Sequence, residues 1–175
     1  MKRNEIEKIE IDLFLEAIAG KYGYDFRDYA RATIFATDFN DFALDKAKEG
    51  VYSIKLLKQY THNYQKAGGK GSLSEYYSAH YDSAILNKSF KKNITFANHN
   101  LVTDSVFGEM NMILCRNVLI YFNKTLQDRV FKLFKDSLIY DGFLCLGTKE
   151  SLQFSSVFNE FKEISKKQKI YQRKI

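Results

Sequence analysis

The chain has 175 residues, of which 45% are apolar and 27% are charged, so it can bury the core of one domain and does not have the composition of a disordered protein. No apolar run approaches the roughly 20 residues that a membrane-spanning helix needs, and the charged start leads into no signal-type segment. The net charge of +6 is a mild bias toward acidic partners. We therefore expect a cytoplasmic protein that does not insert into a membrane.

Cysteine and histidine usage argues against a metal site. Cys115 and Cys145 lie in separate apolar strings, and neither belongs to a C-x-x-C pair. The histidines, His62, His80 and His99, are scattered and offer no zinc spacing. The sequence therefore predicts neither a structural metal nor a disulfide framework.

The first elements are a helix, a strand and a second helix. Apolar residues at helical spacing predict an amphipathic helix from Glu5 to about Tyr22. A β-rich run, Thr33–Thr37, then ends in Asp38 and leads into a predicted helix, Phe39–Lys48, which a glycine closes. A strand that ends in an acidic residue and turns into a helix is half of a βαβ unit.

The next segment, Val51–Ser89, has no clear period, and we interpret it as two helical pieces around a surface loop. The loop holds the main glycine cluster of the chain, Gly68-Gly69-Lys70-Gly71. Because this cluster lies in a polar stretch and follows no strand, we interpret it as a linker and not as a loop that binds phosphate or a cofactor.

The remaining elements again alternate strand and helix. They are, in chain order, strands Asn93–Ala97 and Met110–Cys115, a helix capped by Asn123, a strand Phe143–Leu146 after the turn Asp141-Gly142, and a hairpin of Phe161–Ile164 and Lys169–Gln172. This order predicts an α/β fold whose sheet is mostly parallel, with an antiparallel C-terminal hairpin at one edge.

Polar residues follow three of these strands. Asp38 ends the first, Asn100 follows the second, and Arg116-Asn117 follow the third. Ligands of open α/β sheets bind beyond the carboxyl ends of the strands, where a carboxylate can accept both hydroxyls of a ribose and an asparagine can pair with an adenine edge. Each residue alone is more typical of a turn or a helix cap, but three on one edge favour a nucleoside-containing ligand.

Two further features allow two interpretations each. Tyr121, just past the third strand, is either a half-buried core tyrosine or a residue whose hydroxyl opens into the ligand cleft. The basic residues between Lys162 and Lys174 either line the exposed face of a solvated hairpin or form a stripe that binds phosphate. The solvated hairpin is the commoner case, so we expect no nucleic-acid partner.

The string Cys115-Arg116-Asn117-Val118-Leu119-Ile120-Tyr121-Phe122 resembles the hallmark of the chemotaxis receptor methyltransferases, the CheR family. The resemblance continues in the family's order through Ile34–Asp38 with Ala43–Tyr52, Phe96–Leu101, and Asp141–Gly147 with Glu150-Ser151-Leu152. These motifs cover roughly residues 33–175. Ile11–Ala32 is similar to the start of the family's N-terminal helical domain.

The resemblance implies a Rossmann-like domain that transfers a methyl group from S-adenosylmethionine to a glutamate side chain in the cytoplasmic domain of a chemotaxis receptor. On this analogy Asp38 holds the ribose, and Asn100 and Leu101 frame the adenine. Arg116 and Asn117 line the cofactor beside its sulfonium end, and Tyr121 approaches the transferred methyl group as the candidate catalytic residue. The tyrosine would orient the attacking oxygen, because a carboxylate needs no base.

The chain departs from the family pattern before Asp38. In the family a first strand and a glycine-rich loop precede the acidic strand end, but this chain passes directly from Arg31-Ala32 to Thr33. We therefore predict a remnant of the helical domain over residues 1–32 and a partial methyltransferase domain over residues 33–175. Losing a central strand would leave two partial sheets, with weak or absent cofactor binding and with strand edges open to self-association.

Two functions of different classes follow from these observations. One is a protein-glutamate O-methyltransferase, and the other is a non-catalytic scaffold that acts as an interaction module. A binder or methyltransferase of nucleic acid is a third, supported only by the basic tail and the tyrosines.

Overall fold

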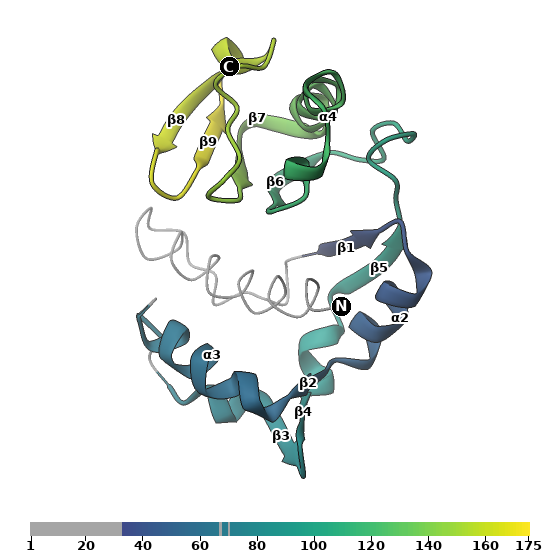
Figure 1. Ribbon diagram of the computed structural model, residues 1–175, viewed down its shortest axis with the longest axis vertical. Coiled ribbons are helices and arrows are strands. Elements are labelled where there is room, and N and C mark those ends of the chain that lie inside the picture. Colours follow the sequence, from purple (N-terminus) through teal and green to yellow (C-terminus); the bar gives the residue numbers. More distant parts are fainter. Residues whose placement is uncertain (1–32, 67, 70) are drawn as a thin grey trace. The chain divides into compact units, whose positions relative to one another are not determined.

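A computed structural model describes residues 33–66, 68–69 and 71–175 (Figure 1). The chain divides into two compact units between His99 and Asn100. The helix predicted from Glu5 to about Tyr22 lies outside the described residues, as does the domain predicted over residues 1–32. Among the helices that the structure does describe, none has the length and the apolar character that crossing a membrane requires.

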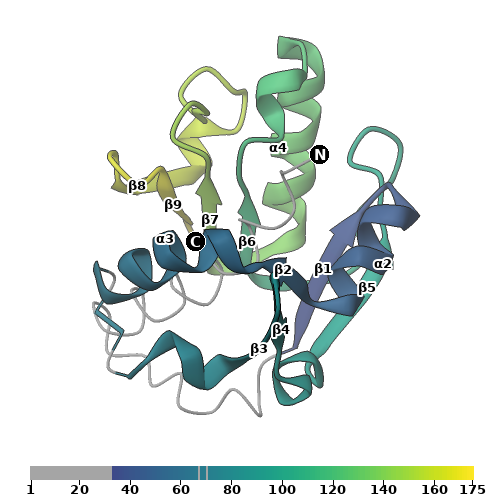
Figure 2. The same ribbon diagram turned by 60° about the horizontal axis from the view of Figure 1, so that its bottom comes forward.

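The first unit contains a parallel pair of strands with a helix against it (Figure 2). Strand β1 (Ile34–Asp38) pairs with β5 (Ile94–Asn98), and helix α2 (Asp41–Glu49) packs against both strands. Asn40 caps the helix by accepting the Phe42 N–H through its side chain, and Gly50 ends it in the left-handed region at φ +67°. The predicted strand-helix unit is confirmed. The sequence shows it because the glycine that ends the helix acts on its own neighbours.

The other described elements of the first unit are a small antiparallel sheet and short helices next to it. Its elements are β2 (Val51–Ser53), α3 (Ile54–Lys66), a 3₁₀ helix (Leu73–Tyr76), β3 (Tyr77–His80), β4 (Ser83–Leu86) and a second 3₁₀ helix (Lys88–Lys91), with strand order β2-β4-β3. The prediction of two helical pieces is right for α3 but wrong for the segment after the loop. Strands of three or four residues are too short to show a period of two, so their pairing is decided by tertiary contacts.

The second unit is a four-stranded sheet with one long helix. It comprises β6 (Met110–Cys115), a 3₁₀ helix (Leu119–Tyr121), α4 (Lys124–Ser137), β7 (Leu138–Leu146), a 3₁₀ helix (Phe158–Glu160), β8 (Phe161–Ser165) and β9 (Ile170–Arg173), with strand order β6-β7-β9-β8. The β6–β7 pair is parallel, and the two pairings of β9 are antiparallel. The cap at Asn123, whose Oδ1 accepts the Leu126 N–H at 2.9 Å, and the C-terminal hairpin are both confirmed.

The described fold is therefore α/β, as predicted, and its strands do not form one sheet, which agrees with the expectation of partial sheets. Within the described residues the parallel pairs β1–β5 and β6–β7 belong to separate sheets, of two and four strands. The prediction of a mostly parallel arrangement is wrong for the described strands, because the pairs β1–β5 and β6–β7 are parallel whereas β2–β4, β3–β4, β7–β9 and β8–β9 are antiparallel.

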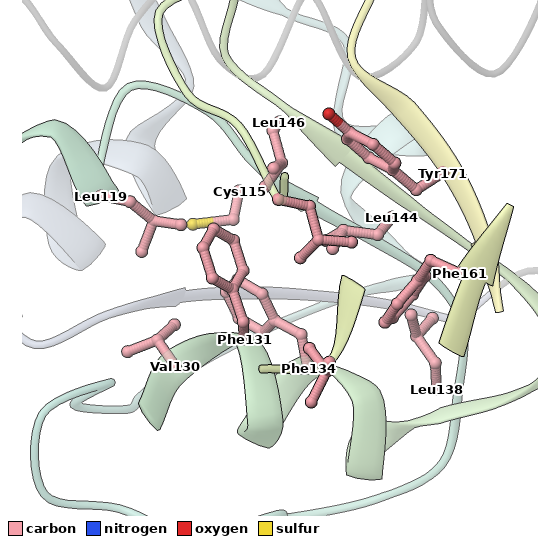
Figure 3. Close-up of a cluster of buried hydrophobic side chains, with 12 residues drawn as sticks. Cys115, Leu119, Val130, Phe131, Phe134, Leu138, Leu144, Leu146, Phe161 and Tyr171 are labelled. Carbon is pink, nitrogen blue, oxygen red and sulfur yellow. The ribbon is translucent and has the colours of Figure 1, made fainter. Parts of the chain in front are cut away.

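Among the described residues the larger cluster of buried apolar side chains belongs to the second unit. Figure 3 shows this cluster. Helix α4 contributes an apolar face that meets side chains of β7 and the hairpin; its buried members are Val130, Phe131 and Phe134. Leu144 and Leu146 on β7 have no exposed surface. Burying one such side chain stabilises a fold by about 1.5–3 kcal/mol, so this cluster contributes strongly to the stability of the second unit.

Candidate functional site

Asp38 is the candidate site residue of the first unit. It ends β1 opposite Asn98, the last residue of the parallel strand β5, and its backbone carbonyl accepts the His99 N–H at 3.1 Å. Its carboxylate is half-buried and accepts the Asn40 N–H at 2.9 Å, so the side chain is fixed by a turn of its own. A carboxylate at the carboxyl end of a parallel pair is chemically suited to accept the hydroxyls of a ribose.

The other candidates belong to the second unit, where Asn100 forms a turn. Its side-chain oxygen accepts the Val102 N–H at 2.9 Å, while its backbone N–H donates to Asp104 Oδ2 at 2.8 Å. The turn-forming interpretation of this residue is therefore confirmed. Since its side-chain oxygen already serves the turn, a contact with an adenine edge would depend mainly on the side-chain NH₂ group.

Leu101 follows in the same turn, and its side chain packs against the core of the second unit. The guanidinium of Arg129 on α4 donates hydrogen bonds to the carbonyls of Leu101 and Thr103, at 3.5 and 3.2 Å. The turn is thus tied to the helix by a charged group that sequence reasoning did not single out.

The hallmark string forms a tight turn between β6 and α4. Arg116 and Asn117 are half-buried, and Asn117 has φ +58°, a left-handed conformation that asparagine tolerates better than most residues. Gln127 on α4 donates its side-chain NH₂ to the carbonyls of Leu119 and Phe122, at 2.9 and 3.0 Å. The turn therefore has a defined shape that both the strand and the helix support.

Tyr121 ends the 3₁₀ helix of this turn. Its side chain is 68% exposed, so the interpretation as a half-buried core tyrosine is wrong. Its backbone N–H donates to the Val118 carbonyl at 3.2 Å, which holds the residue at the surface end of the string. An exposed phenol on a braced turn can reach a group presented by a partner.

A buried carboxylate, Glu150, lies at the centre of the second unit's loops. It is 4% exposed, and it accepts the backbone N–H groups of Gly147, Asn117 and Leu119 at 2.6, 2.9 and 2.7 Å. Sequence reasoning placed Glu150 in a family motif but gave it no role. Two of its three partners lie 31 and 33 residues away, so no local pattern reveals the contact.

The loop that carries Glu150 also lies close to β9. Tyr171 on β9 is 1% exposed, and its phenol lies near the Ser151 side chain and the Leu152 backbone. Burial raises the pKa of Tyr171, and these two polar neighbours partly oppose that shift. Next to this loop is an open cavity of about 190 Å³, lined by Leu119, Ile120, Gln127, Phe131, Lys149, Glu150, Ser151 and Phe154.

The basic C-terminal residues lie on and around the β8–β9 hairpin. Arg173 donates to the Leu138 carbonyl and stacks 4.6 Å from the centre of the Tyr140 ring, and Lys174 donates to the Asn159 carbonyl at 2.8 Å. The hairpin itself is confirmed. Both cationic side chains make contacts within the protein. This favours the interpretation as a solvated hairpin over a stripe that binds phosphate.

The candidate residues of each unit, taken separately, have chemistry that suits the nucleoside half of S-adenosylmethionine better than its methionine half. In the first unit Asp38 has a carboxylate of the kind that binds ribose hydroxyls, and in the second unit Asn100, Arg116 and Asn117 have polar groups at turns. None of the described glycines lies between a parallel strand and an α-helix that it opens. The cluster around Gly69 ends α3 instead, since the Gly69 N–H donates to the Tyr64 carbonyl at 3.0 Å. Within the described part of the chain no group of acidic, histidine or cysteine side chains could hold a metal ion.

Comparison with known proteins gives concordant matches. Residues 17–170 match the family described as "CheR methyltransferase, SAM binding domain". A Pseudomonas putida protein that carries the name methyltransferase Cher3 is 50% identical over 143 residues, which are 82% of this chain and 52% of that protein. A chemotaxis protein methyltransferase of Salmonella typhimurium is 31% identical over 75% of this chain and 44% of its own length. The chain thus spans about half the length of these two relatives.

One solved structure, the N-methyltransferase NodS of Bradyrhizobium japonicum, aligns over 99% of both chains. The TM-score is 0.49 and the sequence identity is 10%, which is too low to carry an argument about this chain.

Proposed function

The chain belongs to the CheR methyltransferase family. On that premise we propose that it acts as a protein-glutamate O-methyltransferase whose substrate is the cytoplasmic domain of a chemotaxis receptor. The observation that carries the proposal is the family match over residues 17–170, which includes the braced turn from Cys115 to Phe122. The named relatives support the same reaction class. A cytoplasmic location follows from a receptor domain as substrate.

Each candidate residue has a role that suits its place in the structure. Asp38 would accept the ribose hydroxyls, and Asn100 and Leu101 would frame the adenine. Arg116 and Asn117 would line the cofactor near its sulfonium end. When bound, S-adenosylmethionine supplies an electrophilic methyl group, which a glutamate carboxylate displaces in line to give a methyl ester and S-adenosylhomocysteine.

The chain's own contribution to the reaction is binding and alignment. A carboxylate attacking a sulfonium neutralises charge, so exclusion of water and correct orientation matter more than acid–base catalysis. The exposed hydroxyl of Tyr121 would orient the attacking oxygen. This role needs no proton transfer, so the residue is proposed as an orienting hydroxyl and not as a base.

The first test is binding of S-adenosylhomocysteine to the 175-residue chain by isothermal titration calorimetry. Because the sequence predicts weak cofactor binding, we expect a low affinity. Asp38→Ala should remove it, while Asp45→Ala, an exposed acid on the adjoining helix α2, should leave it unchanged. The second test is methyl transfer from labelled cofactor to receptor-containing membranes. Tyr121→Phe should abolish transfer, and Tyr140→Phe, at a similarly exposed tyrosine of the same unit, should not.

A non-catalytic interaction module is the second candidate. It is favoured by the division of the described strands into separate sheets, and by the lack, among the described residues, of a glycine-rich loop between a strand and an α-helix. It predicts no transfer at any enzyme concentration and self-association through strand edges. If the wild-type chain neither binds the cofactor nor transfers methyl groups, and analytical ultracentrifugation shows an oligomer, the enzyme proposal is wrong. The interaction module is then the better proposal.

A further inference from the structure

The buried carboxylate of Glu150 joins two loops that follow different strands. Its Oε2 atom accepts the N–H groups of Gly147 and Asn117 at 2.6 and 2.9 Å, and its Oε1 atom accepts the Leu119 N–H at 2.7 Å. We propose that Glu150 is a positioning residue that holds the turn after β6 in the shape needed at the cofactor site. The link to the cofactor rests on the proposed function.

The contacts account for the presence of a charge inside the protein. Removing a carboxylate from water is costly unless hydrogen bonds replace its hydration, and here three N–H groups do so. Among the described residues Glu150 forms no ion pair, so these backbone groups are its main compensation. In return the carboxylate satisfies three donors in irregular backbone, where no strand or helix partner is available.

The same contacts define the conformation of Asn117. Its N–H is held by Glu150 while its φ is +58°, so the bond fixes the residue in the left-handed region. The side chain is placed as well: a Cβ added to Gly147 would lie 2.7 Å from Asn117 Oδ1 and 2.6 Å from its backbone N. Gly147 therefore lets the two loops approach closely, and Glu150 bonds them together.

Glu150 acts through Asn117, the residue that the proposed function puts beside the cofactor. With its oxygens engaged by the turn, the carboxylate is not proposed to touch the ligand. Losing it would leave the β6 strand and the α4 core in place but would free the turn between them. Cofactor affinity should then fall without loss of the folded second unit.

Glutamine is the informative replacement because it keeps the shape of the side chain and has one oxygen. The oxygen can keep the hydrogen bonds from the Gly147 and Asn117 N–H groups. The NH₂ group then faces the Leu119 N–H, and because both are donors this hydrogen bond is lost. Glu150→Gln should therefore release Leu119 more than the other two amides, whereas Glu150→Ala should release all three. Glu160→Gln, an exposed acid of the same unit, is the matched control.

The experiment combines amide hydrogen exchange, followed by NMR on the full chain, with calorimetric binding of S-adenosylhomocysteine. We expect the Leu119 amide of Glu150→Gln to exchange roughly 10- to 100-fold faster, as loss of a hydrogen bond to a charged group implies. The amide of Leu144 in the core should be unchanged. The dissociation constant should rise by roughly tenfold or more in Glu150→Gln and stay at the wild-type value in Glu160→Gln.

The outcomes separate this proposal from the proposed function. Unchanged exchange of the three amides would overturn the positioning role, as would faster exchange with a dissociation constant within about twofold of the wild type. If the wild-type chain does not bind S-adenosylhomocysteine, the proposed function fails, and the exchange pattern by itself decides whether Glu150 holds the turn. If Glu150→Ala does not fold, Glu150→Gln carries the test.

Discussion

The two parallel strand pairs in the described part of the chain lead to candidate site residues but are stabilised differently. No residue of β1 or β5 is fully buried, and Asp38 at their end is fixed by the Asn40 and His99 backbones. By contrast β7 has fully buried leucines, and the turn after β6 is held by the distant Glu150.

The contrast shows two ways of placing a polar group at the end of a strand. One contact of the Asp38 side chain lies two residues along the chain, at the Asn40 N–H, and its carbonyl accepts the His99 N–H at the end of the paired strand. Asn117 is held by a buried carboxylate 33 residues away. Asp38 thus combines a local contact with strand pairing, whereas Asn117 is held by a distant buried side chain.

The largest expected effect comes from removing a core ring of the second unit. Phe131→Ala should lower the free energy of unfolding by about 3–5 kcal/mol, because the side chain is 3% exposed among large neighbours. Phe42→Ala, the same change at a 70% exposed position of the first unit, should stay within about 0.5 kcal/mol of the wild type. Urea unfolding followed by circular dichroism measures both. Equal effects would abolish the contrast between the units.

A smaller effect is expected where the two loops of the second unit meet. Gly147→Ala would put a methyl group 2.6 Å from the backbone N of Asn117, so the loops must separate, at a cost of about 1–3 kcal/mol. Gly108→Ala is the control, because its added Cβ would meet only the end of the Met110 side chain, at 3.4 Å. Thermal unfolding of the two variants compares them. A Gly147→Ala variant as stable as Gly108→Ala would show that the loops are not closely packed.

The smallest expected effect concerns acid stability. Asp128 on α4 accepts the backbone N–H of Ser156 at 2.6 Å and contacts Lys132, and these bonds lower the pKa of Asp128 below its ordinary value. A lowered pKa means that the stabilisation is complete above about pH 5 and is lost as pH falls below about 4, through the pKa of the folded state.

Asp128→Asn should therefore cost about 1 kcal/mol at neutral pH and progressively less in acid. Urea titrations across this pH range measure the difference from the wild type. Asp141→Asn, at an exposed left-handed position that asparagine tolerates, is the matched control at neutral pH and should stay within about 0.5 kcal/mol of the wild type there. A constant difference for Asp128→Asn at every pH would refute the assignment.

Much of the fold could be predicted from the sequence because its signals are local. Asn40, Gly50 and Asn123 punctuate helices α2 and α4, and each acts on its own neighbours. The C-terminal hairpin was predicted from two alternating runs and a polar turn. The antiparallel sheet of the first unit was missed, since β2 and β4 are short and pair across about thirty residues.

The candidate site shows the same limit. The hallmark string identified Arg116, Asn117 and Tyr121 by resemblance, but the exposure of Tyr121 and the left-handed Asn117 came from the structure. The roles of all the site residues remain predictions that the binding and transfer experiments test.

By itself the sequence determined the family, the α/β class and the residues whose side chains suit cofactor binding. These follow from composition, short-range spacing and motifs, which depend only on residues close together in the sequence. Only the tertiary structure decided which strands share a sheet and how the turn after β6 is held. These depend on backbone groups, and backbone N–H groups are the same in every residue but proline. Nothing in the sequence from Gly147 to Leu152 shows that the carboxylate of Glu150 accepts hydrogen bonds from the backbone N–H groups of Asn117 and Leu119.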